Sequence, residues 1–296
     1  MNSPSDDSSA IFALTNRLVD SGVAPLKASE LWRLLDVVPA PAALRGRDEA
    51  AVATAVDGTG LDPGRLVRLL DTGIGLAMRV EGLHERGIGV LTAADPDYPA
   101  RLRQRLGTAA PAVLYFAGDA ALLAADGVAV VGSREADPES LDVAIAAGEH
   151  VARTGLPVVS GAAAGVGSIA MGAALAAGGT VVGVLADPLE QSIGLRGNRT
   201  AIVEGRACLC TPYRPDEAFT PQRALGRNKI VYGLSRVTLV VTCVEGEGST
   251  WAGATEAVRQ GYGEVSVWMG TGAGPANAAL AAAGATPVHD LAAFAP

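Results

Sequence analysis

The stretch from Gly127 to Arg134 constrains the fold of this chain more than any other. Its apolar residues, Val128 to Val131, do not alternate with polar ones, which is typical of a central parallel strand buried on both faces. Gly132, Ser133 and Arg134 follow at the carboxyl end of that strand, where open α/β sheets bind their ligands. Arginine offers a planar fork of donors that matches phosphate oxygens. A tight turn with a solvated arginine is the alternative.

Apolar runs of strand length alternate with helical patterns through the rest of the chain. Helices are predicted over residues 141–154 and 167–177. The strands predicted after 128–131 cover residues 157–159, 180–185, 207–211, 237–242 and 265–269. Because the connections are short, this alternation predicts an α/β fold with a parallel sheet and helices on both faces.

The chain before residue 83 has a different pattern. Short helical segments separated by glycines, such as 28–37 and 48–55, predict a small all-helical domain over residues 10–82. Residues 1–9 are expected to be disordered, and the α/β domain is expected over 83–296. A fragment that begins near Val80 should then fold alone. Helix–turn–helix segments of this kind bind DNA backbone in some proteins, but we favour a packing or interaction module.

Composition limits the possible partners. The formal net charge is −8, so attraction of the whole chain to nucleic acid or to an anionic membrane is not expected, and polyanion binding requires a local basic site. Neither a secretory signal nor an apolar run of membrane length is present, which favours a cytoplasmic protein without a membrane partner. The three cysteines lack metal-ligand spacing and are predicted to be buried thiols. No metal and no cofactor are expected.

Four of the predicted strands end in turns rich in Gly or Ser. These turns cover residues 132–134, 160–165, 246–250 and 270–272. Each turn presents backbone N–H groups and the positive end of a helix dipole, and parallel strands bring such turns to one edge of the sheet. The pattern predicts a phosphate-bearing ligand. Dinucleotide, Walker and nucleophile-elbow motifs are absent from the sequence, so binding without catalysis is expected.

A short basic segment stands out in this acidic chain. Arg223, Arg227 and Lys229 occur within seven residues, and the first two would share a helix face. We interpret the segment as a patch that follows a phosphate backbone, with a solvated helix start as the alternative. The candidate phosphate-binding residues of the turns and of this segment are Gly132, Ser133, Arg134, Ser160, Gly161, Gly165, Arg223, Arg227, Asn228, Lys229, Gly248 and Ser249.

Taken in order and spacing, these motifs resemble the DprA/Smf family of DNA-processing proteins, part of the wider DprA–LOG (SLOG) superfamily. The resemblance runs from about Gly87 to the end of the chain. The N-terminal helices resemble, by position, the sterile-alpha-motif-like or helix-hairpin-helix domain of that family. The matching segments are Val90-Leu91-Thr92, Asp97-Tyr98-Pro99, Gly132-Ser133-Arg134, Ser160-Gly161 with Gly165, Arg227-Asn228-Lys229-Ile230, Gly233-Leu234-Ser235 and Gly248-Ser249.

The resemblance implies an extended Rossmann-like fold and a function in DNA recombination. Members of the family bind single-stranded DNA as homodimers and help to load RecA during natural transformation, the uptake of DNA by competent cells. On this resemblance Arg134, the Ser160-Gly161 turn and the Arg227-Asn228-Lys229 segment would contact phosphates. Phe219 resembles an aromatic residue of the family, although the spacing that follows it is longer here.

The chain departs from the family pattern at the second turn. Ala164 and Gly172 stand where the family has arginines, Gly167 stands for an aspartate and Met171 for a histidine. Loss of two arginines predicts weaker DNA binding with a shallower salt dependence. Two alternatives therefore stay open. One is a SLOG-type sensor or processing enzyme for a small nucleotide-derived ligand, and the other is a scaffold that acts through protein contacts.

Overall fold

The computed structural model describes residues 4–294 of the chain. These residues divide into two compact units. Unit 1 holds the chain up to Tyr98, together with Gly107–Phe116 and Pro212–Arg214. Unit 2 holds Pro99–Leu106, Ala117–Thr211 and the chain from Pro215 onward.

Unit 1 combines short helices with a β-hairpin. Strand β1 (Gly89–Thr92) pairs antiparallel with the first part of β2 (Val113–Gly118), so that Gly89 lies opposite Phe116. The helices of the unit are α1 (Asp6–Thr15), α2 (Ala28–Val37), η1 (Pro41–Leu44), α3 (Glu49–Ala55), α4 (Pro63–Leu70), α5 (Gly73–His84) and η2 (Gly107–Ala109).

The helices of unit 1 and its hairpin form one packed group. Phe12 of α1 meets Tyr115 of β2 edge to face, with 6.0 Å between ring centroids. The indole N–H of Trp32 donates a 2.8 Å hydrogen bond to the carbonyl of Ala110. These contacts join residues on both sides of the expected limit at 82–83. That limit, with the independent folding of a fragment from Val80, stays a prediction.

The disorder expected for residues 1–9 is wrong from Asp6 onward. The side chain of Ser5 caps α1 by accepting a bond from the backbone N–H of Ser8. The Ser8 hydroxyl is buried and donates to Asp95 at 2.5 Å, which fixes the first turn of the helix. The polar residues of this segment favour disorder by composition, but they include the serine that caps the helix. Residues 1–3 of the same expectation lie outside the described residues.

An ion pair ties α2 to α4 in unit 1. The two terminal nitrogens of Arg65 donate to the two carboxylate oxygens of Glu30 at 2.8 and 3.0 Å. Glu30 also accepts from the backbone N–H of Lys27 at the start of α2. The hydrogen bonds from Arg65 are the main reason that the pKa of Glu30 falls from 4.5 to about 2.

This pair predicts a specific acid sensitivity. A carboxylate whose folded pKa is depressed contributes stability that is fully present above its unfolded pKa and is lost as the pH falls through its folded pKa. The melting temperature of the wild type should therefore fall more steeply than that of Glu30→Gln between pH 4.5 and 2, the window set by the two pKa values. Parallel melting curves over this range would contradict the assignment.

Unit 2 is built on a parallel sheet in the order β6-β5-β4-β3-β7-β8-β9. Its strands are β3 (Gly127–Val131), β4 (Val158–Ser160), β5 (Val181–Val184), β6 (Ala207–Thr211), β7 (Ser235–Val240), β8 (Glu264–Trp268) and β9 (Thr286–Val288). Its helices are α6 (Ala100–Leu106), α7 (Ala121–Ala124), α8 (Pro138–Arg153), α9 (Val166–Ala176), α10 (Leu189–Gly194), α11 (Arg196–Val203), α12 (Pro221–Leu234), α13 (Gly248–Gln260) and α14 (Asn277–Ala282).

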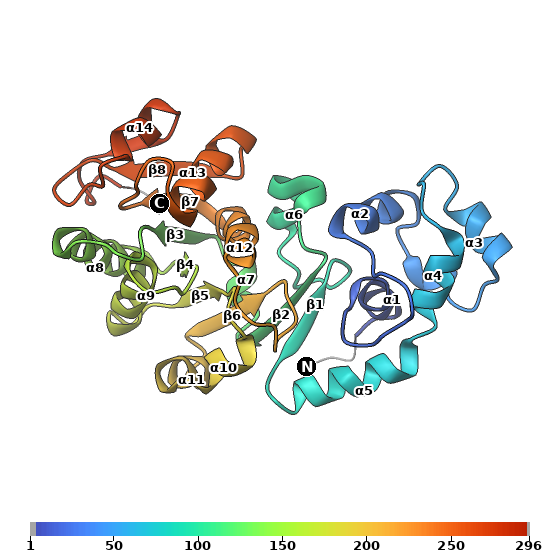
Figure 1. The fold of residues 1–296 in the computed structure, drawn as a ribbon. Coiled ribbons are helices and arrows are strands. Elements are labelled where there is room, and N and C mark those ends of the chain that lie inside the picture. The colour runs from blue at the N-terminus through green and yellow to red at the C-terminus, as the bar shows by residue number, and fades with distance from the viewer. Residues whose placement is uncertain (1–3, 295–296) are drawn as a thin grey trace. The chain divides into compact units, whose positions relative to one another are not determined.

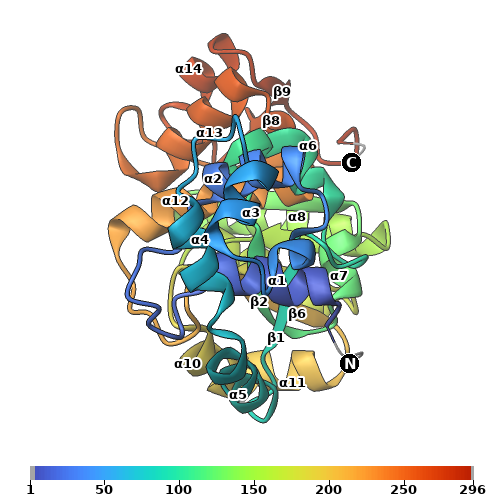
Figure 2. The same ribbon diagram turned by 90° about the vertical axis from the view of Figure 1, so that its right-hand side faces the viewer.

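Helices cover both faces of this sheet. Helices α8 and α9 pack together on β3 and β4, and α12 lies on the opposite side of these strands (Figure 1). Helices α13 and α14 lie beside β8 in both views (Figures 1 and 2). The predicted α/β fold, a Rossmann-like parallel sheet with helices on both faces that follows a helical region, is confirmed.

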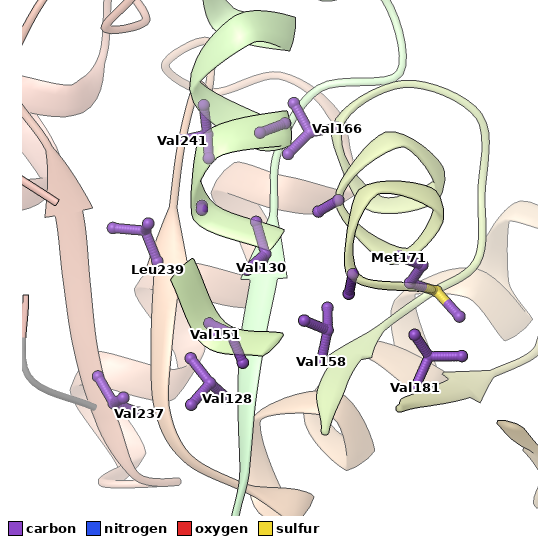
Figure 3. Packing of buried hydrophobic residues seen from close by; sticks show 14 of the residues in the cluster. Val128, Val130, Val151, Val158, Val166, Met171, Val181, Val237, Leu239 and Val241 are labelled. Carbon is purple, nitrogen blue, oxygen red and sulfur yellow. The ribbon is translucent and has the colours of Figure 1, made fainter. Parts of the chain in front are cut away.

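The core under α8 and α9 is made of small and branched apolar side chains. Val128 and Val130 of β3 point toward Val151 and Val166 of these helices (Figure 3). Gly127 and Ala129, which face the other way, are buried as well, so β3 is buried on both faces, as its run of apolar residues predicts. The chain order reverses at β3, because β4 and β5 extend the sheet in one direction while β7 and β8 extend it in the other. Such a switch point opens a crevice at the carboxyl ends of the two central strands.

Candidate functional site

A shallow hollow of about 50 Å³ lies at the carboxyl ends of β3 and β4. Residues of α12 and α13 contribute to its wall. Two of the lining residues are arginines and none is acidic, so the local charge is positive in a chain of net charge −8. The lining consists of Val131, Gly132, Arg134, Ser160, Gly161, Ala163, Ala164, Gly167, Arg227, Asn228 and Ser249.

Arg134 is the exposed cation of the hollow. It follows β3 by three residues, and its guanidinium carbon lies 5.2 Å from the ring centroid of Phe219. Such a cation–π contact fixes the direction of a long side chain while leaving its donors toward solvent. Phe219 is itself 36% exposed. The pair forms an aromatic and cationic edge beside the hollow.

Arg227 is the buried cation of the hollow. It lies in the middle of α12 with only 4% of its surface exposed. Its guanidinium lies over Gly161, so close that a Cβ at position 161 would stand 1.5 Å from Nη1. Glycine at this position therefore makes the room that the arginine occupies. Burial raises the pKa of the neighbouring Cys210 thiol to about 12, although the charge of Arg227 acts in the opposite direction.

The β4–α9 turn forms the third side of the hollow. Ser160 lines the hollow, but its hydroxyl donates to the carbonyl of Val130 at 2.8 Å and so joins β4 to β3. Ala162 is held at φ 49°, in the left-handed region that costs an alanine about 1 kcal/mol. Gly165 lies against the backbone of Arg134, and a Cβ there would stand 2.6 Å from the carbonyl oxygen of that residue.

Apolar atoms fill the side of this turn where the family pattern has polar groups. The methyl of Ala162 and the Cε of Met171 pack against Gly183 of β5. Each lies 3.4 Å from the place that a Cβ at position 183 would occupy. Met171 is 7% exposed. Of the four replaced residues, Met171 thus fills its side of the turn with apolar atoms, whereas Ala164 and Gly167 line the hollow and Gly172 is exposed. A hollow of about 50 Å³ is far smaller than the roughly 300–1,000 Å³ of sites that enclose small molecules.

The basic segment lies within helix α12. The Thr220 hydroxyl caps this helix by accepting from the N–H of Arg223 at 3.1 Å, and Pro221 occupies the first position. Arg223, Arg227 and Lys229 are consequently all helical residues. The Asn228 side chain donates to the carbonyl of Ser249 at 2.7 Å and joins α12 to the start of α13.

Seven of the predicted residues come together at the hollow. They are Gly132, Arg134, Ser160, Gly161, Arg227, Asn228 and Ser249. A further side chain, which the sequence did not single out, supports the same edge: the Thr250 hydroxyl donates to the carbonyl of Gly132 at 2.9 Å.

Five predicted residues do not line the hollow. Ser133 and Gly165 belong to the backbone framework, where the Ser133 N–H donates to Thr242 and its carbonyl accepts from Val166. Gly248 is the first residue of α13. Lys229 is half-buried on α12, two residues beyond Arg227 and so on another side of the helix. Arg223 forms an ion pair with Glu217 and a hydrogen bond with the carbonyl of Ala218.

The fourth expected turn, at residues 270–272, does not line the hollow either. Gly272 lies against the backbone that starts α8, where the Ser140 hydroxyl donates to its carbonyl at 2.7 Å. The turn at 270–272 therefore stabilises α8 and contributes nothing to the lining. Three of the four predicted turns contribute residues to the lining of the hollow.

The pairing of Arg223 predicts a small effect of its replacement. Because Glu217 already neutralises this guanidinium, Arg223→Ala should change the affinity for an anionic ligand less than threefold and the salt dependence not at all. Titration of wild type and variant with one labelled anion at three salt concentrations measures both. A loss as large as that of Arg227→Ala would show that Arg223 leaves Glu217 to bind the ligand.

Several lining residues and contacts were not predicted. Ala163, Ala164 and Gly167 line the hollow, although their sequence suggested only a loss of charged groups. The contact of Phe219 with Arg134 joins positions 85 residues apart, and no local pattern signals it.

The cysteines are buried thiols, as predicted. Cys208, Cys210 and Cys243 are free and buried, and burial raises the pKa of Cys243 to about 11. Within residues 4–294 no group of three or more His, Cys, Asp or Glu side chains is placed to hold a metal ion. In the same range, no helix has the length and apolar character needed to cross a bilayer.

Comparisons with known proteins relate this fold to proteins of DNA recombination. The model of the DNA recombination-mediator protein A family matches residues 89–292. DNA processing protein DprA of Bacillus subtilis (strain 168) is 28% identical over 180 residues, which cover 60% of this chain and 59% of that protein. The chain thus spans less than two thirds of this curated relative.

Two solved structures share the fold. The X-ray structure of DprA from Streptococcus pneumoniae superposes with a TM-score of 0.71 at 22% identity, covering 93% of this chain and 95% of that one. DNA processing protein A from Helicobacter pylori superposes with a TM-score of 0.56 at 23% identity, covering 70% and 93%. The latter structure describes the single-stranded DNA binding mode of that protein. By its match over residues 89–292, this chain belongs to the DNA recombination-mediator protein A family.

Proposed function

We propose that this protein binds single-stranded DNA at the hollow and acts as a DNA recombination mediator. One observation carries the proposal. Two arginines and no acidic residue line a hollow at the carboxyl ends of β3 and β4, and one of them, Arg134, stacks on the exposed ring of Phe219. Arginine forks bind phosphates, and an exposed aromatic ring offers a face to an unstacked base.

The size and openness of the site favour a polymer over a small molecule. A hollow of about 50 Å³ receives one phosphate group and leaves the attached sugar and base outside. A strand that continues over the surface gains contacts on either side, whereas a mononucleotide does not. Single strands also present unpaired bases to the Phe219 ring, which a duplex keeps stacked.

The proposal includes binding without turnover and two protein partners. The lining has no carboxylate, histidine or cysteine to transfer a proton, and the nearby Cys210 thiol stays protonated at neutral pH. Membership of the family supports a recombinase of the RecA type and a second copy of this chain as partners. The relative from Helicobacter pylori, which binds single-stranded DNA, supports the choice of ligand.

Fluorescence anisotropy with a labelled oligo-dT tests the ligand. We expect saturable binding that unlabelled oligo-dT displaces and that a duplex of equal length displaces poorly. The logarithm of the affinity should fall with the logarithm of the salt concentration with a slope of about −0.7 for each phosphate that a cation contacts. A panel of mononucleotides, added as competitors, separates the alternatives. Displacement by a mononucleotide at equal phosphate concentration would favour the small-ligand alternative, and absence of oligo-dT binding would overturn the proposal.

A further inference from the structure

Helix α6 supplies the cations that the end of α12 lacks. The last turn of α12 contains no lysine, arginine or histidine of its own. Its carbonyl groups are buried with Gly233, Leu234 and Ser235. Arg105 of α6 donates to the carbonyls of Gly233, at 3.4 Å, and of Ser235. Arg101 donates to the carbonyl of Leu234 at 3.3 Å. Carbonyls at the end of a helix otherwise have no partner and carry its negative dipole.

The two helices also touch without a gap. A Cβ at Gly233 would stand 2.9 Å from Leu102 and 3.1 Å from Leu106, so glycine lets α6 lie directly on α12. Leu102 and Leu106 are buried by this contact. Burial also lowers the pKa of Arg105, and the positive charge of Arg101 acts in the same direction. The hydrogen bonds of Arg105 to the carbonyls of Gly233 and Ser235 hold it at the end of α12.

The position of α12 matters because Arg227 has little freedom. Its guanidinium occupies the place where any side chain at position 161 would begin. Asn228, the next residue, is tied to Ser249 at 2.7 Å. A helix rises about 1.5 Å per residue, so Leu234 and Arg227 lie about 10 Å apart along one rigid rod. A shift or rotation at the end that Arg105 holds therefore moves Arg227 relative to Gly161.

We propose that Arg105 is a positioning residue for the phosphate site, which holds the C-terminal end of α12 and thereby keeps Arg227 over Gly161. The inference rests on the proposed function for its DNA readout. It assigns no contact between Arg105 and the ligand, since Arg105 is absent from the lining of the hollow.

A double-mutant cycle on oligo-dT binding tests the coupling. Arg105→Ala and Arg227→Ala should each weaken binding about tenfold, and the double variant should bind no more weakly than Arg227→Ala, because the first change acts through the second residue. A loss near a hundredfold in the double variant, or a salt slope reduced by a further 0.7, would make Arg105 an independent DNA contact and overturn the inference. Arg105→Lys keeps the positive charge and a donor group but loses the planar fork, and should fall between wild type and Arg105→Ala.

A matched control and a readout without DNA complete the test. Arg236 is an exposed arginine 3.7 Å from Asp126, the partner of Arg101, so Arg236→Ala should bind like the wild type. Hydrogen exchange of the free protein should quicken along residues 221–234 in Arg105→Ala and stay unchanged in Arg236→Ala. Unchanged exchange in Arg105→Ala would overturn the inference whatever the DNA result. If the wild type fails to bind oligo-dT while exchange quickens, the proposed function fails and the positioning role stands.

Discussion

Replacing Gly161 by alanine should weaken binding of single-stranded DNA as strongly as replacing Arg227 itself. The new Cβ would stand 1.5 Å from Nη1 and 2.5 Å from Cζ of Arg227. Because the obstructing atoms belong to a side chain and not to the backbone, the new methyl group should displace the guanidinium from its place over Gly161 while the backbone stays. The loss of one charge-assisted contact to phosphate is about 1.5–3 kcal/mol, or about ten- to hundredfold in affinity. Anisotropy titrations with oligo-dT measure this loss.

Gly172→Ala is the matched control for this substitution. Gly172 is an exposed residue of the neighbouring helix α9, and a Cβ there meets nothing within 4 Å. The change should leave DNA binding intact and stabilise the protein by up to about 1 kcal/mol, since alanine favours the helix. Wild-type affinity in Gly161→Ala, together with weak binding in Arg227→Ala, would show that Arg227 binds the ligand without its guanidinium lying over Gly161.

Most of the sheet could be predicted because buried parallel strands carry a strong signal. The run Val128 to Val131 appears as β3 at the centre of unit 2, and the helix expected over 28–37 is α2 without change. Helices α10 and α11 were not predicted, because each has eight residues or fewer and they are separated by Leu195 alone, so neither is long enough for a helical period to stand out. In such segments tertiary packing decides the structure.

In the site, too, residues at the ends of regular strands were predicted, and contacts made by irregular loops were missed. The carboxyl ends of parallel strands share an edge, so Gly132, Arg134 and Gly161 could be expected together. The pairing of Arg223 with Glu217 depends on a loop of no regular pattern. Arg227 and Lys229 lie on different sides of α12 because the helix that Thr220 caps runs through both residues.

Arg134→Ala should reduce both the affinity for single-stranded DNA and the salt dependence of binding. Arg134 is exposed and its ordered contact is the ring of Phe219, so its loss should leave the melting temperature unchanged. Removal of its phosphate contact should lower the affinity for oligo-dT about ten- to hundredfold and reduce the slope against salt by about 0.7. Arg134→Lys keeps the charge but loses the planar fork and the stacking, and should retain the slope while binding more weakly.

The contribution of Phe219 can be separated in the same assay. Phe219→Ala removes the ring that directs Arg134 and offers a face to a base, so the affinity should fall about fivefold or more while the salt slope stays near that of the wild type. Arg196→Ala, an exposed arginine of α11 outside the hollow, is the control for a simple loss of positive charge. If Arg134→Ala and Arg196→Ala bind alike at every salt concentration, the phosphate backbone crosses another part of the surface and the hollow is not its site.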